Sequence, residues 1–402
     1  MKLLFVTPFV PYPPSFGGSV RIYHLVRELA RNNEVSLLTY AEPGGGGDPA
    51  GLAPFCREVI CVPRDVGGKR WRQLASVFSR RSFQVAFHHS VGMQRAIDAA
   101  VARLGIEAVI VEFSQMTGFT FPEGVVLILD EHNLEYDLLA RMAETGGPVR
   151  RLFNRLEVRK FRKEELRAVR DADLTLVTSA RDRDLLARNV PGLNAAVVTN
   201  GVDTAHFARP EGPRKPNTAV FVGATHYYPN EDGVRFFLEK IFHRVAREIP
   251  DFQFVVVGGI PPDSIRREAS DRVAVTGFVD DVRPYMWEAS VFVVPLRMGG
   301  GTRFKVVEAL AAETPVVSTR LGAEGIPVTS GREVLLADDP AAFAAAVIAV
   351  LRDNNMARRL STRGLDFVRR RYDWRVVGCG LETAVREALG RRRREGRDDT
   401  AR

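Results

Sequence analysis

The chain has 402 residues, of which 45% are apolar and 26% are charged, and its formal net charge at pH 7 is +8. This length is too great for one ordinary hydrophobic core and predicts two domains, and the lack of a long apolar run argues against a membrane-spanning helix. The three cysteines follow neither a disulfide nor a metal-ligand spacing. The positive charge predicts an anionic partner: nucleic acid, anionic lipid or a phosphorylated substrate.

The chain begins with a short apolar run at residues 3–7, which is typical of a strand covered on both faces. A proline cluster without a small-residue cleavage site follows the run. We therefore interpret it as a strand rather than a signal peptide and expect a cytoplasmic protein. A glycine loop at residues 16–19 and a helical pattern that ends near residue 33 complete this first strand–loop–helix unit.

Strands and helices then alternate in two series. The first series predicts strands at residues 34–40, 108–113, 125–130, 173–179 and 195–200. The second series predicts them at residues 219–224, 252–259, 272–278, 290–296, 314–319 and 333–339. Residues 200–218 are rich in Gly, Pro, Asn and Thr and are interpreted as a linker. The fold class is therefore α/β, with two doubly wound domains in tandem.

A glycine loop stands between a strand and a helix in each domain, at residues 16–19 and 299–302. Such loops lie at the carboxyl ends of the strands, where the amides and dipole of the next helix favour a phosphate. Arg303 and Lys305 follow the second loop and supply charge for a diphosphate, and Glu308 offers two oxygens to adjacent hydroxyls such as those of a ribose. The alternative is a plain turn, a solvated arginine and a surface ion pair between Lys305 and Glu308.

Other nucleotide and metal motifs are less well supported. The sequence has no G-x-x-x-x-G-K-[ST] loop and no G-x-G-x-x-G in its first glycine loop, which argues against a P-loop NTPase and a nicotinamide dehydrogenase. Asp182 and Asp184 have the spacing of an Asp-x-Asp metal motif. With Ser179 before them, they are better explained as the acidic first turn of a helix that the serine caps.

Four segments together resemble the retaining glycosyltransferases of family 4, which have the GT-B fold. NGVDTAHF at residues 200–207 resembles the signature at the family's interdomain hinge, and residues 221–237 resemble the start of its nucleotide-binding domain. Residues 275–326 are the most specific match and resemble bacterial members that act in exopolysaccharide and lipopolysaccharide assembly. YDW at residues 372–374 resembles the segment before the family's last helix.

The resemblance implies two Rossmann-like domains that face each other across a cleft. The N-terminal acceptor domain is expected at residues 1–199, joined by a helix that crosses back to it at about residues 374–390. The C-terminal domain, at residues 200–373, is expected to bind the nucleotide-sugar donor. Residues 391–402 have no apolar period and are expected to form a disordered basic tail.

The resemblance also assigns roles to residues of the glycine loops. Gly18 matches the N-terminal loop that faces the donor phosphate, and Arg303 and Lys305 match the basic positions beside the diphosphate. Near-complete loss of transfer is expected when this charge is removed, because it stabilises the departing diphosphate.

Glu308 matches the second glutamate of the family's E-x7-E motif, which binds the nucleotide ribose. Gly300 stands where the family has the first glutamate. The backbone amides of Gly300, Gly301 and Thr302 are therefore expected to contact the donor sugar in its place.

Three further polar residues follow predicted strands. His132 lies where the family often has a histidine near the transferred sugar, and the alternative is a cap or a solvated loop residue. His226 and Asn230 follow the first strand of the second domain and are expected to contact the donor. The alternative for Asn230 is an N-cap of the helix after Pro229.

The function that the resemblance implies is transfer of a sugar from a nucleotide-diphosphate sugar to an acceptor hydroxyl with retention at the anomeric carbon. The acceptor is expected to be a cell-surface glycan or a lipid-linked precursor, and no metal or other cofactor is expected. Two alternatives stay open: a GT-B sugar-nucleotide epimerase, and a catalytically silent GT-B partner subunit.

Positive charge is concentrated at residues 148–170, which hold nine Lys/Arg against three Glu. This segment predicts either an amphipathic helix on the anionic inner face of the cell membrane or a domain helix whose apolar stripe packs on the sheet. The run Arg391–Arg394 could add to such a membrane contact. Nucleic acid is not expected, because no recognition motif accompanies the charge.

Overall fold

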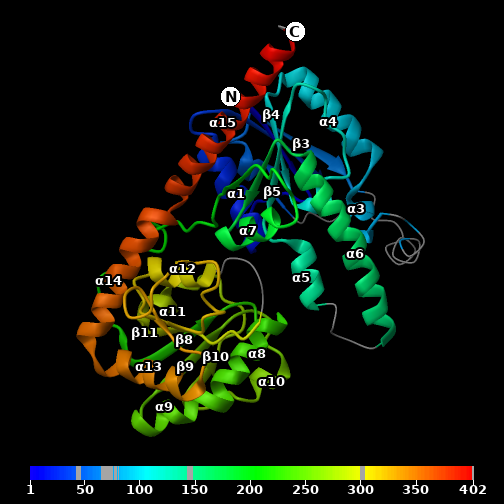
Figure 1. The fold of residues 1–402 in the computed structure, drawn as a ribbon. Coiled ribbons are helices and arrows are strands. Elements are labelled where there is room, and N and C mark those ends of the chain that lie inside the picture. Colours follow the sequence, from blue (N-terminus) through cyan, green and yellow to red (C-terminus); the bar gives the residue numbers. More distant parts are fainter. Residues whose placement is uncertain are drawn as a thin grey trace. The chain divides into compact units, whose positions relative to one another are not determined.

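A computed structural model describes residues 1–41, 47–64, 76, 79, 81–142, 148–298 and 304–400. The chain forms two compact units (Figure 1). Unit 1 comprises Met1–Thr199 and Val377–Arg402, and unit 2 comprises Asn200–Val376. The chain returns to unit 1 within the long helix α15 (Trp374–Thr400).

Unit 1 is built on a seven-stranded sheet of order β3-β2-β1-β4-β5-β6-β7, and every pairing is parallel. Its strands are β1 (Lys2–Thr7), β2 (Glu34–Ala41), β3 (Glu58–Pro63), β4 (Ala108–Glu112), β5 (Val126–Glu131), β6 (Leu174–Val177) and β7 (Ala195–Val197). Its other helices are α1 (Gly17–Leu29), η1 (Pro49–Leu52), α3 (Phe83–His88), α4 (Val91–Leu104), η2 (Ser114–Met116), α5 (Glu135–Met142), α6 (Pro148–Asp171) and α7 (Ala180–Ala187).

Unit 2 repeats this plan with a six-stranded parallel sheet of order β10-β9-β8-β11-β12-β13. Its strands are β8 (Lys215–Val222), β9 (Gln253–Val257), β10 (Val273–Val275), β11 (Ala289–Val294), β12 (Val316–Ser318) and β13 (Leu335–Leu336). Its helices are α8 (Tyr228–Phe236), η3 (Phe237–Phe242), α9 (His243–Glu248), α10 (Asp263–Arg266), α11 (Arg283–Glu288), α12 (Phe304–Ala311), α13 (Pro340–Arg352) and α14 (Asn354–Arg371).

The central strands of both units are buried on both faces. In β1, Leu3 to Val6 are fully buried, and β11 buries Val291 to Val294 completely. This explains why these strands are continuous apolar runs rather than alternating ones, since helices cover each face of a parallel sheet. The predicted α/β class with two doubly wound sheets is confirmed.

Strand β3 was missing from the predicted elements. It pairs with β2 alone, at the edge of the sheet, and five of its six residues are half-buried or exposed. An edge strand needs no continuous apolar run, so its sequence carries a weaker signal.

The prediction of a disordered tail at residues 391–402 is wrong for its first part, because α15 continues to Thr400. Arg391 donates to Asn194 (3.1 Å), Arg392 to Asp173 (3.3 Å) and Arg393 to Glu107 (2.6 Å). These polar contacts attach the end of the helix to unit 1. The prediction relied on a regular spacing of apolar residues, which this segment lacks.

Helix α6 packs its apolar residues into unit 1. Phe161, Leu166 and Val169 are buried in a cluster with Leu129 and Val177, which confirms the interpretation as a domain helix for this half of α6. No helix of the described residues offers an apolar stretch of the length that a bilayer crossing requires.

Candidate functional site

Each sheet has one point at which the strand order reverses. It lies between β1 and β4 in unit 1 and between β8 and β11 in unit 2. Ligands of open α/β sheets bind at the carboxyl ends of the strands beside such a point, because the loops that follow diverge there and leave room. The residues after these four strands are therefore the candidates for function.

Helix α1 begins after β1 and carries the predicted Gly18 in its first turn. Ser19 stabilises this end: its Oγ accepts hydrogen bonds from the backbone N–H groups of Ser15 (3.0 Å) and Phe16 (3.1 Å). A Cβ atom at position 18 would lie 2.9 Å from Cζ of Phe113. Gly18 therefore has a packing role at the reversal point, and its contact with a donor phosphate stays a prediction.

One turn later, α1 carries a buried cation. Nε and Nη2 of Arg21 donate to Oδ2 (2.9 Å) and Oδ1 (2.7 Å) of Asp130, which lies near the end of β5. Nη1 donates to the carbonyl oxygens of Val198 (2.9 Å) and Thr199 (3.2 Å). The two side chains are 1% and 0% exposed. This two-pronged ion pair fixes α1 against β5 and the chain beyond β7.

His132 follows β5 and is joined to β4. Its Nε2 lies 2.6 Å from Oε2 of Glu112 and 3.7 Å from Oδ2 of Asp130. The ring of Phe113 covers it, with ring centroids 3.8 Å apart. Phe113 holds a φ of 70°, in the left-handed region that few non-glycine residues adopt. Because the chain turns in this way, an aromatic ring lies over the histidine.

Burial sets the protonation of this cluster. It lowers the pKa of His132 to about 3 and, with the negative charge of Asp130, raises that of Glu112 well above its usual value. Within the described part of the chain, Glu112, Asp130 and His132 are the one group with donor atoms close enough for a metal ion. A cation fits poorly here, since Arg21 already places a positive charge on Asp130.

A second acidic group lies beside the first. Glu165 of α6 accepts hydrogen bonds from the backbone N–H groups of Glu135 (2.9 Å) and Tyr136 (2.8 Å) and so caps α5. Both carboxyl oxygens of Glu131 are buried without a hydrogen-bond partner. Burial raises the pKa of Glu165 to about 8 and that of Glu135 to about 7. This cap was not predictable from the sequence, because Glu165 lies 30 and 29 positions from the two residues whose N–H groups it accepts.

In unit 2, the predicted Lys305 and Asn230 come together. Nζ of Lys305 donates to Oδ1 of Asn230 (2.8 Å), and Nδ2 of Asn230 donates to the carbonyl oxygen of Ala224 (2.9 Å). Nζ also lies 4.1 Å from the ring centroid of Phe221. A Cβ atom on Gly223 would lie 2.7 Å from Nζ, so the glycine leaves room for the ammonium group.

Glu308 lies on the same helix as Lys305, three residues later. Its carboxylate forms no hydrogen bond with the described residues, and it is not among their buried, unsatisfied groups. Its oxygens are therefore accessible. Burial raises the pKa of Glu308 to about 7, and the positive charge of Lys305 opposes the shift. No ion pair within 4.0 Å between Lys305 and Glu308 is found among the described residues, although the charge of Lys305 still acts on the carboxylate.

The remaining predicted residues have different outcomes. Asn230 is not an N-cap: Tyr227 holds that place in α8, and Asn230 is buried in the first turn. His226 is exposed after β8. The glycine loop with Arg303 lies outside the described residues, and this includes Gly300, Gly301 and Thr302. The Ser179 cap on α7 is confirmed, since its Oγ accepts from the N–H of Asp182 (3.2 Å).

Sequence reasoning missed Arg21, Glu112 and Phe113. The one available signal was a charged residue within or directly after an apolar run, as in the AVIVE of β4. Arg21 has the helical neighbours Ile22 and Leu25, both fully buried. A charge on the buried face of a helix requires a partner, although the pattern does not say which.

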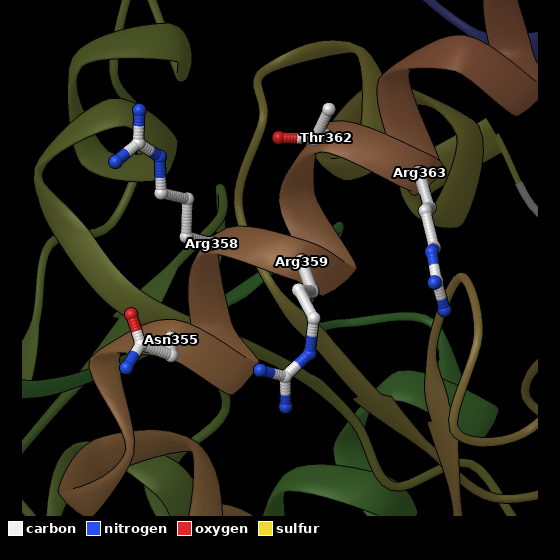
Figure 2. A pocket seen from close by; sticks show the side chains of 5 residues that line it. All are labelled: Asn355, Arg358, Arg359, Thr362 and Arg363. Carbon is white, nitrogen blue, oxygen red and sulfur yellow. The ribbon is translucent and has the colours of Figure 1, made fainter.

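Unit 2 also has a groove that contains none of the predicted residues. It has a volume of about 340 Å³ and lies along α14 (Figure 2). Its lining consists of Asn355, Arg358, Arg359, Thr362 and Arg363. In Figure 2 the arginine side chains point in different directions rather than toward one point.

Comparison with known proteins finds a family match within the second unit. Residues 216–353 match the family described as Glycosyl transferases group 1. The matched segment contains Asn230, Lys305 and Glu308, so the site in unit 2 lies within the residues that match this family.

Curated relatives match about half of the chain. A phosphatidyl-myo-inositol mannosyltransferase of Mycolicibacterium smegmatis is 32% identical over 47% of this chain and 51% of its own length. The lipopolysaccharide core biosynthesis mannosyltransferase LpsB of Rhizobium meliloti is 28% identical over 49% of this chain and 60% of its own length. The chain thus spans about half the length of the curated relatives that it matches.

Solved structures resemble the chain over nearly its whole length. A sucrose-phosphate synthase from Thermosynechococcus elongatus gives a TM-score of 0.69 at 18% identity and covers 97% of this chain and 99% of its own. HepE of Anabaena, solved with UDP, gives a TM-score of 0.66 at 14% identity and covers 96% of this chain and 100% of its own. At such identities the likeness establishes the fold alone, which is GT-B.

Proposed function

We propose that the protein is a retaining glycosyltransferase that moves a sugar from a nucleotide-diphosphate sugar to an acceptor hydroxyl. The observation that carries this proposal is the accessible Glu308 carboxylate beside Lys305 at the reversal point of unit 2. A carboxylate without a protein partner accepts hydrogen bonds from two neighbouring hydroxyls, as on a ribose. The group 1 glycosyl transferase match of the surrounding residues supports this assignment.

Unit 2 would hold the donor through charge. Lys305, Arg303 and the amides of Gly300, Gly301 and Thr302 would surround the diphosphate, with His226 near the donor. The contact between Lys305 and Asn230 keeps the ammonium group in place before the ligand arrives. A positioned cation stabilises the charge that develops on the leaving diphosphate without reorganisation at the moment of reaction. This role requires no metal ion.

Unit 1 would hold the transferred sugar or the acceptor through His132 and the Gly18 turn. His132 is uncharged at neutral pH because burial lowers its pKa to about 3, so it serves as a hydrogen-bonding group rather than a proton carrier. In a retaining reaction without a protein nucleophile, the departing phosphate oxygen takes the acceptor proton. The protein then orients the acceptor hydroxyl.

The acceptor would belong to the cell envelope. Relatives are named as mannosyltransferases for phosphatidyl-myo-inositol and for the lipopolysaccharide core. A glycan or lipid-linked acceptor would bring the protein to an anionic membrane surface, and the groove on α14 offers a basic surface for that contact.

The charge of α14 favours this membrane contact. Exposed arginines elsewhere in unit 2, such as Arg235, Arg320 and Arg352, contact a carboxylate. The three groove arginines form no hydrogen bond or ion pair with the described residues (Figure 2). Because they diverge, they fit several lipid phosphates better than one.

Vesicle flotation tests the membrane contact. Gln in place of Arg358, Arg359 and Arg363 should weaken binding to anionic vesicles by about 100-fold, since each of three basic residues near such a surface contributes about 1 kcal/mol. The matched control places Gln at three paired arginines, Arg235, Arg320 and Arg352, and removes the same charge. Equal losses in both triple variants would show that net charge alone attracts the protein.

The function itself is tested with purified protein, a panel of sugar nucleotides and an acceptor extract. Transfer should be accompanied by release of nucleoside diphosphate, and Glu308→Ala and Arg303→Ala should abolish it while the fold stays intact. Near-normal activity in either variant would remove the role of that residue. An epimerase would change the sugar nucleotide without an acceptor, and a silent subunit would do neither.

A further inference from the structure

Glu112 has one partner for two oxygens. Oε2 lies 2.6 Å from Nε2 of His132, whereas Oε1 is fully buried and forms no hydrogen bond. The carboxylate of the neighbouring Asp130 is already engaged by Arg21. Glu112 is therefore a completely buried carboxyl group that faces a ring nitrogen of His132 through Oε2 and lies beside the Asp130 carboxylate.

A buried carboxyl group of this kind is more stable in its protonated form. An ionised carboxylate would leave a charged oxygen without a partner in a low dielectric, next to the negative charge of Asp130. The protonated form leaves only a carbonyl-like oxygen unsatisfied. Burial and Asp130 accordingly raise the pKa of Glu112 well above its usual value. The single proton then lies on Oε2, the oxygen that faces the histidine.

The other ring nitrogen of His132 is directed differently. Nδ1 forms no hydrogen bond with the described residues, and it is not among their buried, unsatisfied atoms. Since the side chain is 6% exposed, its small accessible area includes Nδ1. The imidazole thus contacts Glu112 at one nitrogen and reaches the surface at the other.

We propose that Glu112 is a positioning residue whose protonated carboxyl donates to Nε2 of His132 and so fixes the tautomer in which Nδ1 carries the proton. His132 then presents a neutral N–H donor at the surface of unit 1, and it would donate to an oxygen of the bound sugar or acceptor. It cannot act as a base, because its lone pair is already occupied by Glu112. The substrate contact rests on the proposed function, whereas the tautomer does not.

The groups that face this pair agree with a neutral state. Asp130 lies 3.7 Å from Nε2 and would favour an imidazolium, but Arg21 neutralises it with two hydrogen bonds. The Phe113 ring covers one face of the imidazole. Thr178 donates to the backbone oxygen of His132 (3.3 Å) and leaves the ring unaffected.

Nitrogen NMR of the full-length protein, labelled with ¹⁵N in histidine, reads the tautomer directly. The His132 signal is assigned by its loss in His132→Asn. We expect a protonated Nδ1, an unprotonated Nε2 and no titration between pH 5 and 8. An Nε2–H tautomer, an imidazolium or a midpoint near 6.5 would overturn the proposal, whatever the activity of the protein.

Substitutions of Glu112 separate hydrogen bonding from charge. Glu112→Gln keeps a neutral donor for Nε2, so the Nδ1–H tautomer and kcat should stay within about threefold of the unmodified protein. Glu112→Leu removes the donor, and we expect mixed tautomers and a fall in kcat of about 10- to 100-fold, as for other residues that orient a histidine. If Glu112→Gln loses the tautomer or titrates, the carboxyl acts through its charge and the proposal is wrong.

The same variants distinguish the proposal from the proposed function. If the tautomer is as expected but kcat does not respond to Glu112→Leu in a folded protein, His132 has no role in transfer. If Glu112→Leu does not fold, the NMR result on the unmodified protein and on Glu112→Gln still decides the matter.

Discussion

The charged residues at the two points where the strand order reverses have opposite surroundings. In unit 1, Arg21, Asp130, Glu112 and His132 contact one another and are almost completely buried. In unit 2, Glu308 has no partner among the described residues and Lys305 is tethered to an uncharged amide. One site uses its charged groups to hold the fold, whereas the Glu308 carboxylate of the other stays available to a ligand.

This difference has a physical reason. Buried ions are tolerated only with a partner, and a partner inside the protein leaves no charge for a ligand. A site that binds a diphosphate and a ribose must keep its charged groups accessible until the ligand binds. We therefore expect unit 1 to respond to mutation mainly through stability and geometry, and unit 2 mainly through ligand affinity.

Removal of Arg21 should have the largest effect. Arg21→Met leaves Asp130 buried and without its cation. It also removes the hydrogen-bond donor of the carbonyl groups of Val198 and Thr199. Loss of one partner of a buried pair lowers the free energy of unfolding by about 3–5 kcal/mol. Urea denaturation measures this, and amide hydrogen exchange in β5 and α1 locates it.

The control for Arg21 is an exposed ion pair of the same unit. Arg103→Met breaks the ion pair with Glu58 (2.8 Å), in which the Arg103 side chain is 57% exposed and the Glu58 side chain 36%. The substitution should lower the free energy of unfolding by less than about 1 kcal/mol. Similar losses for both variants would contradict the distinction between a structural and a surface ion pair.

Glu308→Ala should have the largest effect on affinity. Two hydrogen bonds from ribose hydroxyls to a carboxylate are worth about 3 kcal/mol together, so the Kd for a nucleoside diphosphate should rise about 100-fold. Isothermal titration calorimetry measures it. Glu268→Ala, at an exposed glutamate of the same unit, should leave the Kd unchanged. If both variants bind alike, the ribose assignment fails.

Much of the fold was predictable because buried parallel strands are recognisable in the sequence as apolar runs. β1, β4, β5, β8 and β11 each contain a continuous apolar run, and their alternation with helices leaves few other arrangements. The edge strand β3 and the end of α15 escaped prediction because polar contacts hold them, as between Arg393 and Glu107. Such contacts join residues that are distant in the sequence and leave no period.

The site in unit 2 was more predictable than the site in unit 1. Lys305 and Glu308 lie three residues apart on one helix, so their proximity follows from local geometry. Arg21 and Asp130 are separated by 109 positions and meet only through the sheet. Asn230 falls between these cases: its place after β8 was predicted, but its contact with Lys305, 75 positions away, was not.

The two sites should also differ in their response to pH. Burial raises the pKa of Glu308 to about 7, and the carboxylate accepts hydrogen bonds from both hydroxyls only when it is ionised. Its ionised fraction rises about tenfold between pH 6 and pH 8, so nucleoside diphosphate affinity should rise by up to the same factor. Calorimetry across this range measures it, and Glu308→Gln should abolish the dependence. A rise that persists in Glu308→Gln would assign the titration to another group.

Asn230→Ala should give the smallest change. It distinguishes the effect of holding the Lys305 ammonium group in place from the effect of its charge. The substitution removes the hydrogen bond that holds Nζ but leaves the ammonium group, so it should weaken diphosphate binding by about fivefold, the effect of one hydrogen bond. Asn355→Ala, at an exposed asparagine on α14, is the control and should have no effect. Binding that is as weak in Asn230→Ala as in Lys305→Ala would mean that the ammonium group works only when held by Asn230. In that event unit 2, like unit 1, would depend on a preformed contact, and the contrast between the two sites would narrow to Glu308.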